Sequence, residues 1–355
     1  MSALKENYDV IIVGSGPAGA AAAKTFCHSG LDVVIIEKCP LPRDKMCSGV
    51  ILPSARKFLE QHYDDLPEHI FTTPRTLKCS RYVRMNDDQS RVMSFPALDL
   101  AEDPSDEYGF NVSRSAFDLW LCEASGAALA DNCFLIDYKE EPENITVQVK
   151  HNGKYMEIKA KYLIGADGTI SRVRRTLAPE LEQSLNWIAL YEEHYECQID
   201  LEPGWMYWIL DQHSFGSILH KGKNLHITAA TTWGETAKNL LKRYVNFLTA
   251  QHGLKIAKTT MTRGIIMNDQ PFRGDYLLGK GNILLVGEAA GFVRALDGIT
   301  SALVTGKATG ESVLQSIQSG KTALDYYSQH ELVVAEQEIC NKSHLKMAEL
   351  GFPAG

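Results

Sequence analysis

The feature that most constrains this chain is a glycine-rich turn between an apolar strand pattern and an alanine-rich helix pattern near its start. Residues 8–19 read Tyr-Asp-Val-Ile-Ile-Val-Gly-Ser-Gly-Pro-Ala-Gly, and a second apolar run ends on Glu37, 18 residues after Gly19. A strand, a glycine turn, a helix, a second strand and a terminal acid, in this order, form the fingerprint of a βαβ unit that binds a dinucleotide. Because all five parts are present, the pattern is far more specific than three spaced glycines alone.

Each position of this fingerprint has a physical role. Gly14 permits the tight turn, Gly16 lets the backbone approach a pyrophosphate, and Gly19 lets helix and strand pack closely. The helix N-terminus then favours the anion through its unpaired N–H groups and its macrodipole. Glu37 is placed to accept hydrogen bonds from a ribose diol, and its charge would repel a 2′-phosphate. The candidate cofactor-binding residues here are Gly14, Ser15, Gly16, Pro17, Ala18, Gly19, Glu37 and Lys38.

The composition limits what the rest of the molecule can be. At 355 residues the chain can form one large α/β domain and a second, interleaved one. Its formal net charge of −8 argues against nucleic acid and anionic lipid as partners. No apolar run approaches the roughly 18 residues that span a bilayer, and the first residues lack the apolar core of a signal peptide. We therefore expect a cytoplasmic protein without a transmembrane segment.

The spacing of cysteine and histidine indicates neither a metal site nor a disulfide framework. The eight cysteines contain no Cys-x-x-Cys pair, and the histidines are dispersed along the chain. Most of the cysteines are therefore expected to be small buried side chains.

Two later segments have the pattern of strands that return to the first domain. Residues 162–174 form an apolar run that opens onto Asp167 and Gly168, and residues 282–291 form another that ends in Gly287 and Glu288. Together with the N-terminal fingerprint, these segments resemble the glutathione-reductase-like flavoproteins, specifically the p-hydroxybenzoate hydroxylase group. The resemblance implies an α/β fold in which a Rossmann-type parallel sheet binds FAD and is interleaved with a mostly antiparallel-sheet substrate domain.

The same resemblance implies where several residues meet the cofactor. Asp167 and Gly168 would lie near the pyrophosphate and the outer face of FAD, and Gly287 and Glu288 would meet the ribityl chain. Glu288 stands where the family usually has Asp. The helix start at residues 298–300 would present backbone N–H groups to the pyrimidine end of the flavin, where a helix N-terminus stabilises negative charge. The implied contacts are Arg114, Asp167, Gly168, Gly287, Glu288, Gly298, Ile299 and Thr300.

A narrower resemblance involves the loop at residues 43–49. Geranylgeranyl reductases and their relatives have a similar Lys-x-Cys-Gly-Gly loop, with the cysteine beside the isoalloxazine, and this chain has Ser48 where glycine is usual. The resemblance makes Cys47 and Ser48 cofactor contacts and Cys47 a candidate catalytic residue. The alternative is that Cys47 is a buried structural thiol.

The segments divide the chain into interleaved parts. We predict that residues 1–70, 112–175 and 276–322 form the FAD domain, that 71–111 and 176–275 form the substrate domain, and that 323–355 form a C-terminal helical segment. Alternating patterns predict strands at 190–199, 205–210 and 224–231, and residues 236–251 are expected to form a helix. The substrate sheet would cover the flavin.

One strand of the substrate domain is rich in aromatic residues. Prenyl-reducing relatives have a Pro-x-x-Tyr-x-Trp-x-Phe-Pro pattern here, of which Pro203 and Trp208 remain. Tyr207 and Trp208 are candidate catalytic residues, and His220 and Asp297 are further candidates. The alternative is strand packing, and since successive side chains alternate, Trp205 and Tyr207 must point away from Trp208.

These features favour an FAD-dependent monooxygenase that hydroxylates an aromatic substrate. The chain length, the short C-terminus and the altered cysteine loop are similar to the maturation flavoproteins of tryptophylquinone enzymes, which act on a tryptophan of a partner protein. The partner would then be an aromatic small molecule or a client precursor protein.

Two other functions remain open. One is a flavin-dependent reductase of isoprenoid double bonds, with Cys47 as a proton source, and the other is a non-catalytic FAD-binding scaffold. Halogenation is disfavoured because the chain has no Trp-x-Trp-x-Ile motif. Since no second dinucleotide fingerprint is present, NAD(P)H would act as a transient reductant or another donor would be used.

Overall fold

The computed structural model describes residues 4–84, 93–95, 109–211, 214–231, 236–295 and 297–349, and the side chains of 79–84, 93–95, 210–211 and 347–349 are outside that description. The chain divides into two compact units. The nucleotide unit consists of Met1–Asp44, Ser115–Leu185 and Gln270–Lys342. The sheet unit consists of Lys45–Arg114, Asn186–Asp269 and Ser343–Gly355.

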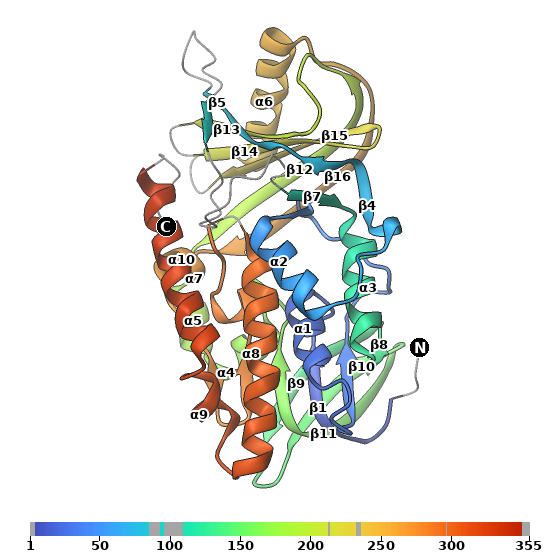
Figure 1. Ribbon diagram of the computed structural model, residues 1–355, viewed down its shortest axis with the longest axis vertical. Coiled ribbons are helices and arrows are strands. Elements are labelled where there is room, and N and C mark those ends of the chain that lie inside the picture. The colour runs from blue at the N-terminus through green and yellow to red at the C-terminus, as the bar shows by residue number, and fades with distance from the viewer. Residues whose placement is uncertain are drawn as a thin grey trace. The chain divides into compact units, whose positions relative to one another are not determined.

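The nucleotide unit contains a mainly parallel sheet with the strand order β17-β18-β11-β1-β2-β8. Figure 1 labels β1, β8 and β11 of this sheet. β1 (Asn7–Val13) lies between β2 (Val33–Ile36) and β11 (Lys154–Gly165), and both pairings are parallel. β18 (Ile283–Leu285) adds in parallel to β11, and β8 (Ala128–Ala130) adds in parallel to β2. Continuous apolar runs form these strands because helices cover a parallel sheet on both faces.

Close packing between two helices fixes one layer of this unit. α1 (Pro17–Thr25) contains four consecutive buried alanines, and α8 (Gly298–Ser319) packs against it. A methyl group added at Gly306 of α8 would lie 2.3 Å from the carbonyl oxygen of Ala18. Small residues on both helices therefore allow backbone-to-backbone contact.

Further elements complete the nucleotide unit. A hairpin extends from β11, and short helices follow the strands. These elements are β9 (Cys133–Glu140), β10 (Ile145–His151), β17 (Gly279–Lys280), α3 (Arg114–Ser125), α4 (Arg172–Leu177), α5 (Pro179–Ser184), α7 (Gln270–Arg273), η2 (Gly287–Ala290), α9 (Ala323–Tyr327) and α10 (Glu331–Glu349).

The sheet unit has a larger sheet with the order β16-β12-β15-β14-β13-β5-β6 among the described strands. Neighbouring strands are antiparallel except that β5 runs parallel to β13. A smaller sheet of β3, β7 and β4 lies with α2 in the same unit. The elements are β3 (Val50–Ile51), α2 (Pro53–His62), η1 (Glu68–Ile70), β4 (Phe71–Leu77), β5 (Cys79–Arg84), β6 (Met93–Phe95), β7 (Gly109–Val112), β12 (Trp187–Gln198), β13 (Trp205–Asp211), β14 (Ser214–Lys221), β15 (Asn224–Thr231), α6 (Ala237–His252) and β16 (Lys255–Asn268).

Helix α6 covers one face of the larger sheet. Its buried side chains, among them Leu241 and Tyr244, form a core with Tyr207, Ile218 and Ile227 of the strands. A methyl group added at Gly216 of β14 would lie 2.3 Å from the Tyr244 ring. The face of this sheet beneath α6 therefore forms part of an apolar core, whereas the opposite face does not belong to that core.

The fold class predicted from the sequence is confirmed. A parallel nucleotide-binding sheet and a mostly antiparallel second sheet are both present. The helix expected at 236–251 is α6, and the C-terminal segment contains two helices, α9 and α10. The strands β14 and β16 were not predicted from the sequence.

The unit boundaries differ from the predicted domain boundaries at several places, and residues 176–185 and 270–275, predicted for the substrate domain, belong to the nucleotide unit. Residues 45–70 belong to the sheet unit because β3 pairs with β7, which also pairs with β4. The segment from 323 to 342 belongs to the nucleotide unit, where α9 packs against α8. Much of the predicted substrate block 71–111 lies outside the described residues.

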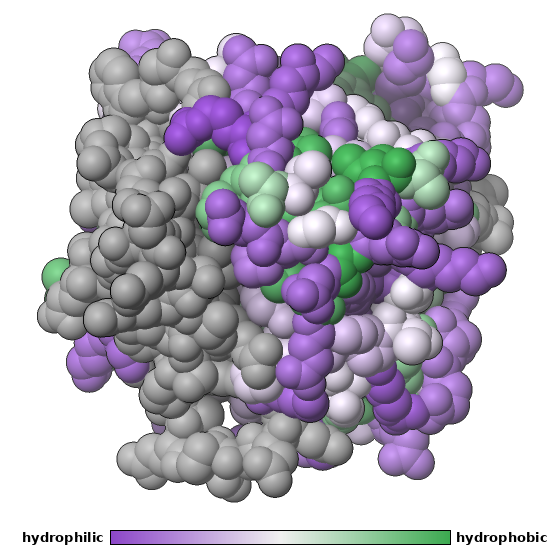
Figure 2. All heavy atoms as spheres, turned by 90° about the horizontal axis from the view of Figure 1, so that it is seen from above, coloured by the Kyte–Doolittle hydropathy of each residue, from purple (hydrophilic) through white to green (hydrophobic). Residues whose placement is uncertain are grey.

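The exposed surface agrees with a chain in which 23% of the residues are charged. The face shown in Figure 2 is mostly hydrophilic, and its hydrophobic area is small and bordered by hydrophilic residues. Among the described residues, no helix combines the length and the apolar composition that crossing a membrane requires.

Replacing Gly306 by alanine should destabilise the nucleotide unit. Since the added methyl group would overlap the Ala18 carbonyl, α8 must move away from α1, at a cost of about 1–3 kcal/mol. Thermal unfolding should show this loss, whereas Gln318→Ala, at an exposed position of the same helix, should leave the midpoint unchanged. An unchanged midpoint for Gly306→Ala would contradict this account of the packing.

Candidate functional site

Three segments far apart in the sequence meet at the carboxyl ends of β1, β11 and β18. Val13 of β1 pairs with Gly165 of β11, which pairs with Leu285 of β18. A methyl group at Gly14 would lie 2.4 Å from the Ala166 carbonyl oxygen, and one at Gly287 would lie 3.2 Å from Cβ of Ala18. The carboxyl edge of such a sheet is where α/β folds bind nucleotides.

The three fingerprint glycines are required for different reasons. Gly14 has a φ of +108°, which side-chain-bearing residues rarely adopt, and a methyl group at Gly19 would lie 2.0 Å from the Gly14 carbonyl oxygen. Gly16 begins α1 with an ordinary φ of −79°, and a methyl group there would come no closer than 3.5 Å, to Nη2 of Arg43. The protein itself therefore has room for a methyl group at Gly16, which is expected if a bound ligand and not the protein requires glycine there. This open backbone at a helix N-terminus fits a dinucleotide pyrophosphate.

Glu37 is buried and fully engaged with its neighbours. Its Oε2 accepts hydrogen bonds from Ser15 N–H and Oγ at 3.1 and 2.7 Å, and its Oε1 accepts one from Cys39 N–H at 3.1 Å. Burial alone would raise the pKa of Glu37, but the Arg43 charge and the hydrogen bonds hold it below its usual value. The carboxylate of Glu37 therefore stabilises the turn at Ser15. It also lies at the position where the resemblance implies a ribose contact.

Arg43 is a site residue that the sequence analysis did not select. Its Nε lies 3.1 Å from Oε2 of Glu37, and its Nη2 lies 3.1 Å from Oδ2 of the buried Asp118. These two carboxylates hold the guanidinium beside Gly16, where it can help neutralise a pyrophosphate. Lys38, by contrast, is exposed.

Asp167 uses its carboxylate inside the protein. Oδ1 accepts from Ser171 Oγ at 2.6 Å, and Oδ2 accepts from the N–H groups of Arg172 and Val173 at 2.6 and 3.2 Å. These bonds fix the start of α4 and place the Cα of Asp167 3.1 Å from a methyl group built at Gly14. Its contribution to the site is to hold the backbone of residues 167 and 168 in place.

The segment around residue 287 also comes close to this turn. Gly168 lies beside Glu288, whose Oε2 would be 3.8 Å from a methyl group at Gly168. Gly287 is buried with a φ of +56°, and its N–H donates to Oγ1 of Thr305 at 3.0 Å. Glu288 is partly exposed, so its carboxylate stands at the open side of the cradle formed by these segments.

The start of α8 requires a correction. The Thr300 N–H donates to Oδ1 of Asp297 at 3.0 Å, and the Thr300 hydroxyl also donates to that carboxylate. Asp297 is therefore the N-cap of α8, so the Thr300 N–H is occupied by it. Gly298 and Ile299, at the first two helical positions, remain the candidates for a backbone anion contact.

In the sheet unit, the loop at Cys47 and Ser48 is tightly folded against neighbouring backbone. The Gly49 N–H lies 3.4 Å from Sγ of Cys47, and a methyl group at Gly49 would lie 2.4 Å from the Val112 carbonyl oxygen and 2.8 Å from Nζ of Lys221. Arg114, buried at the start of α3, also approaches Gly49, at 3.5 Å from the same methyl position. The structure thus brings Cys47 and Arg114 together with Lys221.

Burial lowers the pKa of Lys221 to about 7, and its Nζ donates to the Val112 carbonyl oxygen at 2.7 Å. Lys221 was not predicted as a site residue, because no local sequence motif distinguishes a lysine at the end of an antiparallel strand from any other lysine.

Tyr207 and Trp208 lie on opposite faces of the sheet, as the alternation predicted. Tyr207 is buried in the core under α6, and its hydroxyl donates to the Glu202 carbonyl oxygen at 3.0 Å. It is therefore a packing residue, and the proposed catalytic role of Tyr207 has no support. His220 is on the same face, since it alternates with Leu219 and pairs with Leu225 of that core. Trp208 lies on the other face.

That other face carries a group of ionisable side chains on adjacent strands. Glu192 of β12 pairs with Thr228 of β15 and with Arg263 of β16, and His194 of β12 pairs with His226 of β15. Glu192 is 1% exposed, and both Arg263 Nε (2.9 Å) and Nη2 (2.6 Å) donate to its Oε1. We call Glu192, His194, Lys221, His226 and Arg263 the ionisable cluster.

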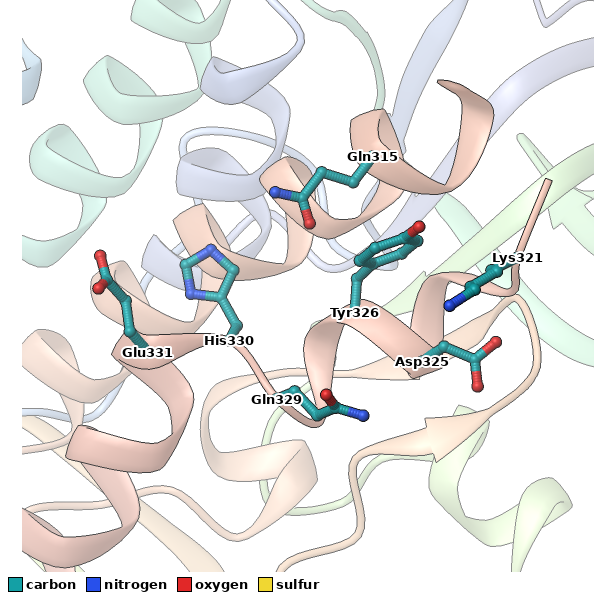
Figure 3. Close-up of a pocket in the computed structure, with 7 residues that line it drawn as sticks. All are labelled: Gln315, Lys321, Asp325, Tyr326, Gln329, His330 and Glu331. Atoms are coloured by element: carbon teal, nitrogen blue, oxygen red, sulfur yellow. The ribbon is translucent and has the colours of Figure 1, made fainter. Parts of the chain in front are cut away.

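A separate cavity of about 670 Å³ lies on the nucleotide unit, between the end of α8 and the start of α10 (Figure 3). It is open and polar, and no residue of the predicted site lines it. The lining side chains are Gln315, Lys321, Asp325, Tyr326, Gln329, His330 and Glu331.

The fold and the glycine cradle define a nucleotide-binding flavoprotein of the p-hydroxybenzoate hydroxylase type. The family described as FAD binding domain matches residues 7–62 and 85–300. The chain belongs to this family and is an FAD-dependent oxidoreductase.

The chain is also similar to individual known proteins in sequence or in fold. It shares 29% identity over 319 residues with Protein CbrA of Escherichia coli O9:H4 (strain HS), a match that covers 84% of this chain and 79% of the relative. A geranylgeranyl bacteriochlorophyll reductase-like protein from Thermoplasma acidophilum has a similar fold, with a TM-score of 0.78, 18% identity and coverage of 98% of this chain and 89% of that one. The p-nitrophenol 4-monooxygenase of Pseudomonas putida has a TM-score of 0.68, with 14% identity and coverage of 97% and 90%.

Replacing Gly16 by alanine should abolish FAD retention without unfolding the protein. The added methyl group meets no protein atom closer than 3.5 Å, yet it occupies the space where a pyrophosphate approaches the backbone. The flavin absorbance of the purified protein and its circular dichroism measure the two effects separately. A Gly16→Ala protein that stays yellow would refute this role.

Replacing Tyr207 by phenylalanine should lower stability by about 1 kcal/mol, because one hydrogen bond is lost. Flavin binding and turnover should be unchanged, since the hydroxyl donates to the Glu202 carbonyl oxygen and the ring belongs to the core under α6. Thermal unfolding and steady-state kinetics test this, and a loss of turnover with unchanged stability would restore Tyr207 to the reacting site.

Proposed function

We propose that this FAD-dependent oxidoreductase is a monooxygenase that hydroxylates an aromatic substrate. In the net reaction, the substrate and O₂ take up two electrons and two protons and give the hydroxylated product and water. The fold likeness to p-nitrophenol 4-monooxygenase is consistent with this proposal.

The observation that carries the proposal is the polarity of the ionisable cluster. A site for an isoprenoid chain should be lined by apolar side chains, since buried charges without polar partners are costly. The sheet face opposite α6 instead holds a buried carboxylate, a guanidinium and two stacked imidazoles. Such a face suits a polar aromatic substrate.

The residues of the chain have separable tasks in this proposal. FAD, when bound, supplies the electron-transfer and oxygen chemistry. The backbone at Gly16 and the Arg43 guanidinium would hold its pyrophosphate, and the start of α8 at Gly298 would stabilise negative charge at the ring. Trp208, on the same face as the ionisable cluster, would pack against the aromatic ring of the substrate.

Reduction of isoprenoid double bonds is the second candidate function. It is favoured by the likeness to the Thermoplasma acidophilum protein and by the loop that holds Cys47 beside Gly49. In that reaction a hydride and a proton add across a carbon–carbon double bond, with Cys47 as the proton source, and no oxygen is consumed.

The electron donor and the form of the substrate belong to the same proposal. NAD(P)H would reduce the flavin and would bind only transiently, because the chain carries one dinucleotide fingerprint and FAD would occupy it. The substrate would be a free aromatic compound or a tryptophan side chain of a client precursor protein.

The two functions predict different mass changes in the product. With reduced FAD-loaded protein and ¹⁸O₂, an aromatic substrate panel that includes tryptophan peptides should gain one labelled oxygen. The Cys47→Ser variant should retain this activity. A geranylgeranyl probe that gains two hydrogens under anaerobic conditions, with loss of that activity in Cys47→Ser, would favour the reductase instead.

A further inference from the structure

The sheet unit presents one apolar face and one polar face. Tyr207, Ile218 and Ile227 pair across neighbouring strands beneath α6. Their sequence neighbours alternate to the opposite face, where Trp208, Ser217 and Thr228 pair across the same strands. On that face Thr228 and the cluster members Lys221, His226 and Arg263 are partly exposed, whereas Glu192 and Trp208 are buried.

The carboxylate of Glu192 is already saturated. Besides the two bonds from Arg263, its Oε2 accepts from Thr228 Oγ1 at 2.8 Å, and His194 Nε2 lies 2.7 Å from its Oε1. Although burial alone would raise the pKa of Glu192, these partners lower it to about 2. It is therefore a fixed anion whose charge is balanced by Arg263.

This arrangement disfavours a metal ion, although Glu192, His194 and His226 lie close enough to share one. The two imidazoles are stacked with centroids 3.4 Å apart and planes inclined by 9°. Lone pairs on parallel rings do not converge on one ion, and the guanidinium at Glu192 repels a cation.

A positive charge and an unsatisfied polar atom remain on this face. Lys221 is faced by Cys47 of the loop, Arg114 at the start of α3, Glu192 of β12, His226 of β15 and Arg263 of β16. Among the described residues that act on Lys221, Glu192 favours the charged ammonium, whereas Arg114 and Arg263 oppose it. Nδ1 of His226 is buried and has no hydrogen-bond partner in the described part of the chain.

The geometry points to Lys221 and His226 as the binding site for an oxyanion on the aromatic substrate, either a carboxylate or a phenolate. The ammonium supplies the missing counter-charge, and His226 as its neutral Nδ1–H tautomer donates the second hydrogen bond. Glu192 and Arg263 act as positioning residues through His194. This assignment rests on the proposed function for the aromatic nature of the substrate.

The pH dependence of binding has a defined sign. Burial lowers the pKa of Lys221 to about 7, so the ammonium is present below that pH and is lost as the pH rises through it. Burial first, and then the neighbouring imidazole of His194, lower the pKa of His226 to about 3, so this ring stays neutral across the same range. Binding of an oxyanion should therefore weaken above about pH 7.

Calorimetric titration of the FAD-loaded protein with benzoate and with 4-nitrophenol tests the assignment. Benzoate should bind more tightly at about pH 6 than at about pH 8.5, on either side of the Lys221 pKa. The Lys221→Met variant should bind it roughly 30-fold more weakly at the lower pH and lose the pH dependence. Lys223→Met, at an exposed position two residues away, is the matched control and should bind as the parent protein does.

The outcomes separate the alternatives. Preference for benzoate identifies a carboxylate, and preference for 4-nitrophenol, with a rise in phenolate absorbance, identifies a phenolate. Lys221→Arg should restore much of the benzoate binding, and a normal unfolding midpoint for Lys221→Met shows that the loss is local. Equal binding by Lys221→Met, no binding of either probe at millimolar concentration, or tight Zn²⁺ binding lost in His226→Leu would overturn the assignment. Lys221-dependent binding without oxygen insertion would overturn only the proposed reaction.

Discussion

The contact between the Gly14 turn and the backbone at residues 166 and 167 is the constraint on which the nucleotide unit depends. A single methyl group at Gly14 would lie 2.4 Å from the Ala166 carbonyl oxygen, and Gly19 and Gly306 have equally close backbone neighbours. A side chain at Gly14 would separate the ends of β1 and β11, one at Gly19 would push α1 away from the turn, and one at Gly306 would separate α8 from α1. The result is a region in which several backbones approach one another without side chains between them. Gly16 stands at its open edge, so the surface offered to a cofactor is made of peptide groups and a helix N-terminus.

The sheet unit solves a different physical problem. One face of its sheet obtains its stability from the apolar core under α6. The other face holds charges that are costly to remove from water, and the buried carboxylate of Glu192 is retained there by several partners. Glu192 is bound by side chains from three strands, which fixes both its position and that of His194. A scaffold that needed only stability would gain more from apolar side chains there. The apolar face therefore has a structural explanation, and the polar face is explained by the ligand site that we propose there.

The sequence predicted the fold of the nucleotide unit well because its signals are local. The strand, turn and helix between residues 8 and 26 are contiguous, and the two later strands carry their own glycine and acid markers. The ionisable cluster could not be found this way. Glu192 and Arg263 are 71 residues apart, and their contact depends on the register of β12 with β16, which no local pattern specifies. Alternation along β13 did separate Tyr207 from Trp208, but which face is buried was decided by the packing of α6.

Acidic residues show a further limit of motif-based prediction. Glu37, Asp167 and Asp297 were all selected as candidates for ligand contact or chemistry, and each uses its carboxylate to hold backbone N–H groups of its own segment. A carboxylate that caps a helix or closes a turn also determines which N–H groups remain available beside it. At α8, the carboxylate of Asp297 accepts from the N–H of Thr300, so Gly298 and Ile299 are the remaining candidates for a backbone anion contact. The acids of such motifs would thus affect cofactor binding through the backbone that they hold in place. For this reason the sequence predicts where a motif lies but does not predict which of its atoms contact the cofactor.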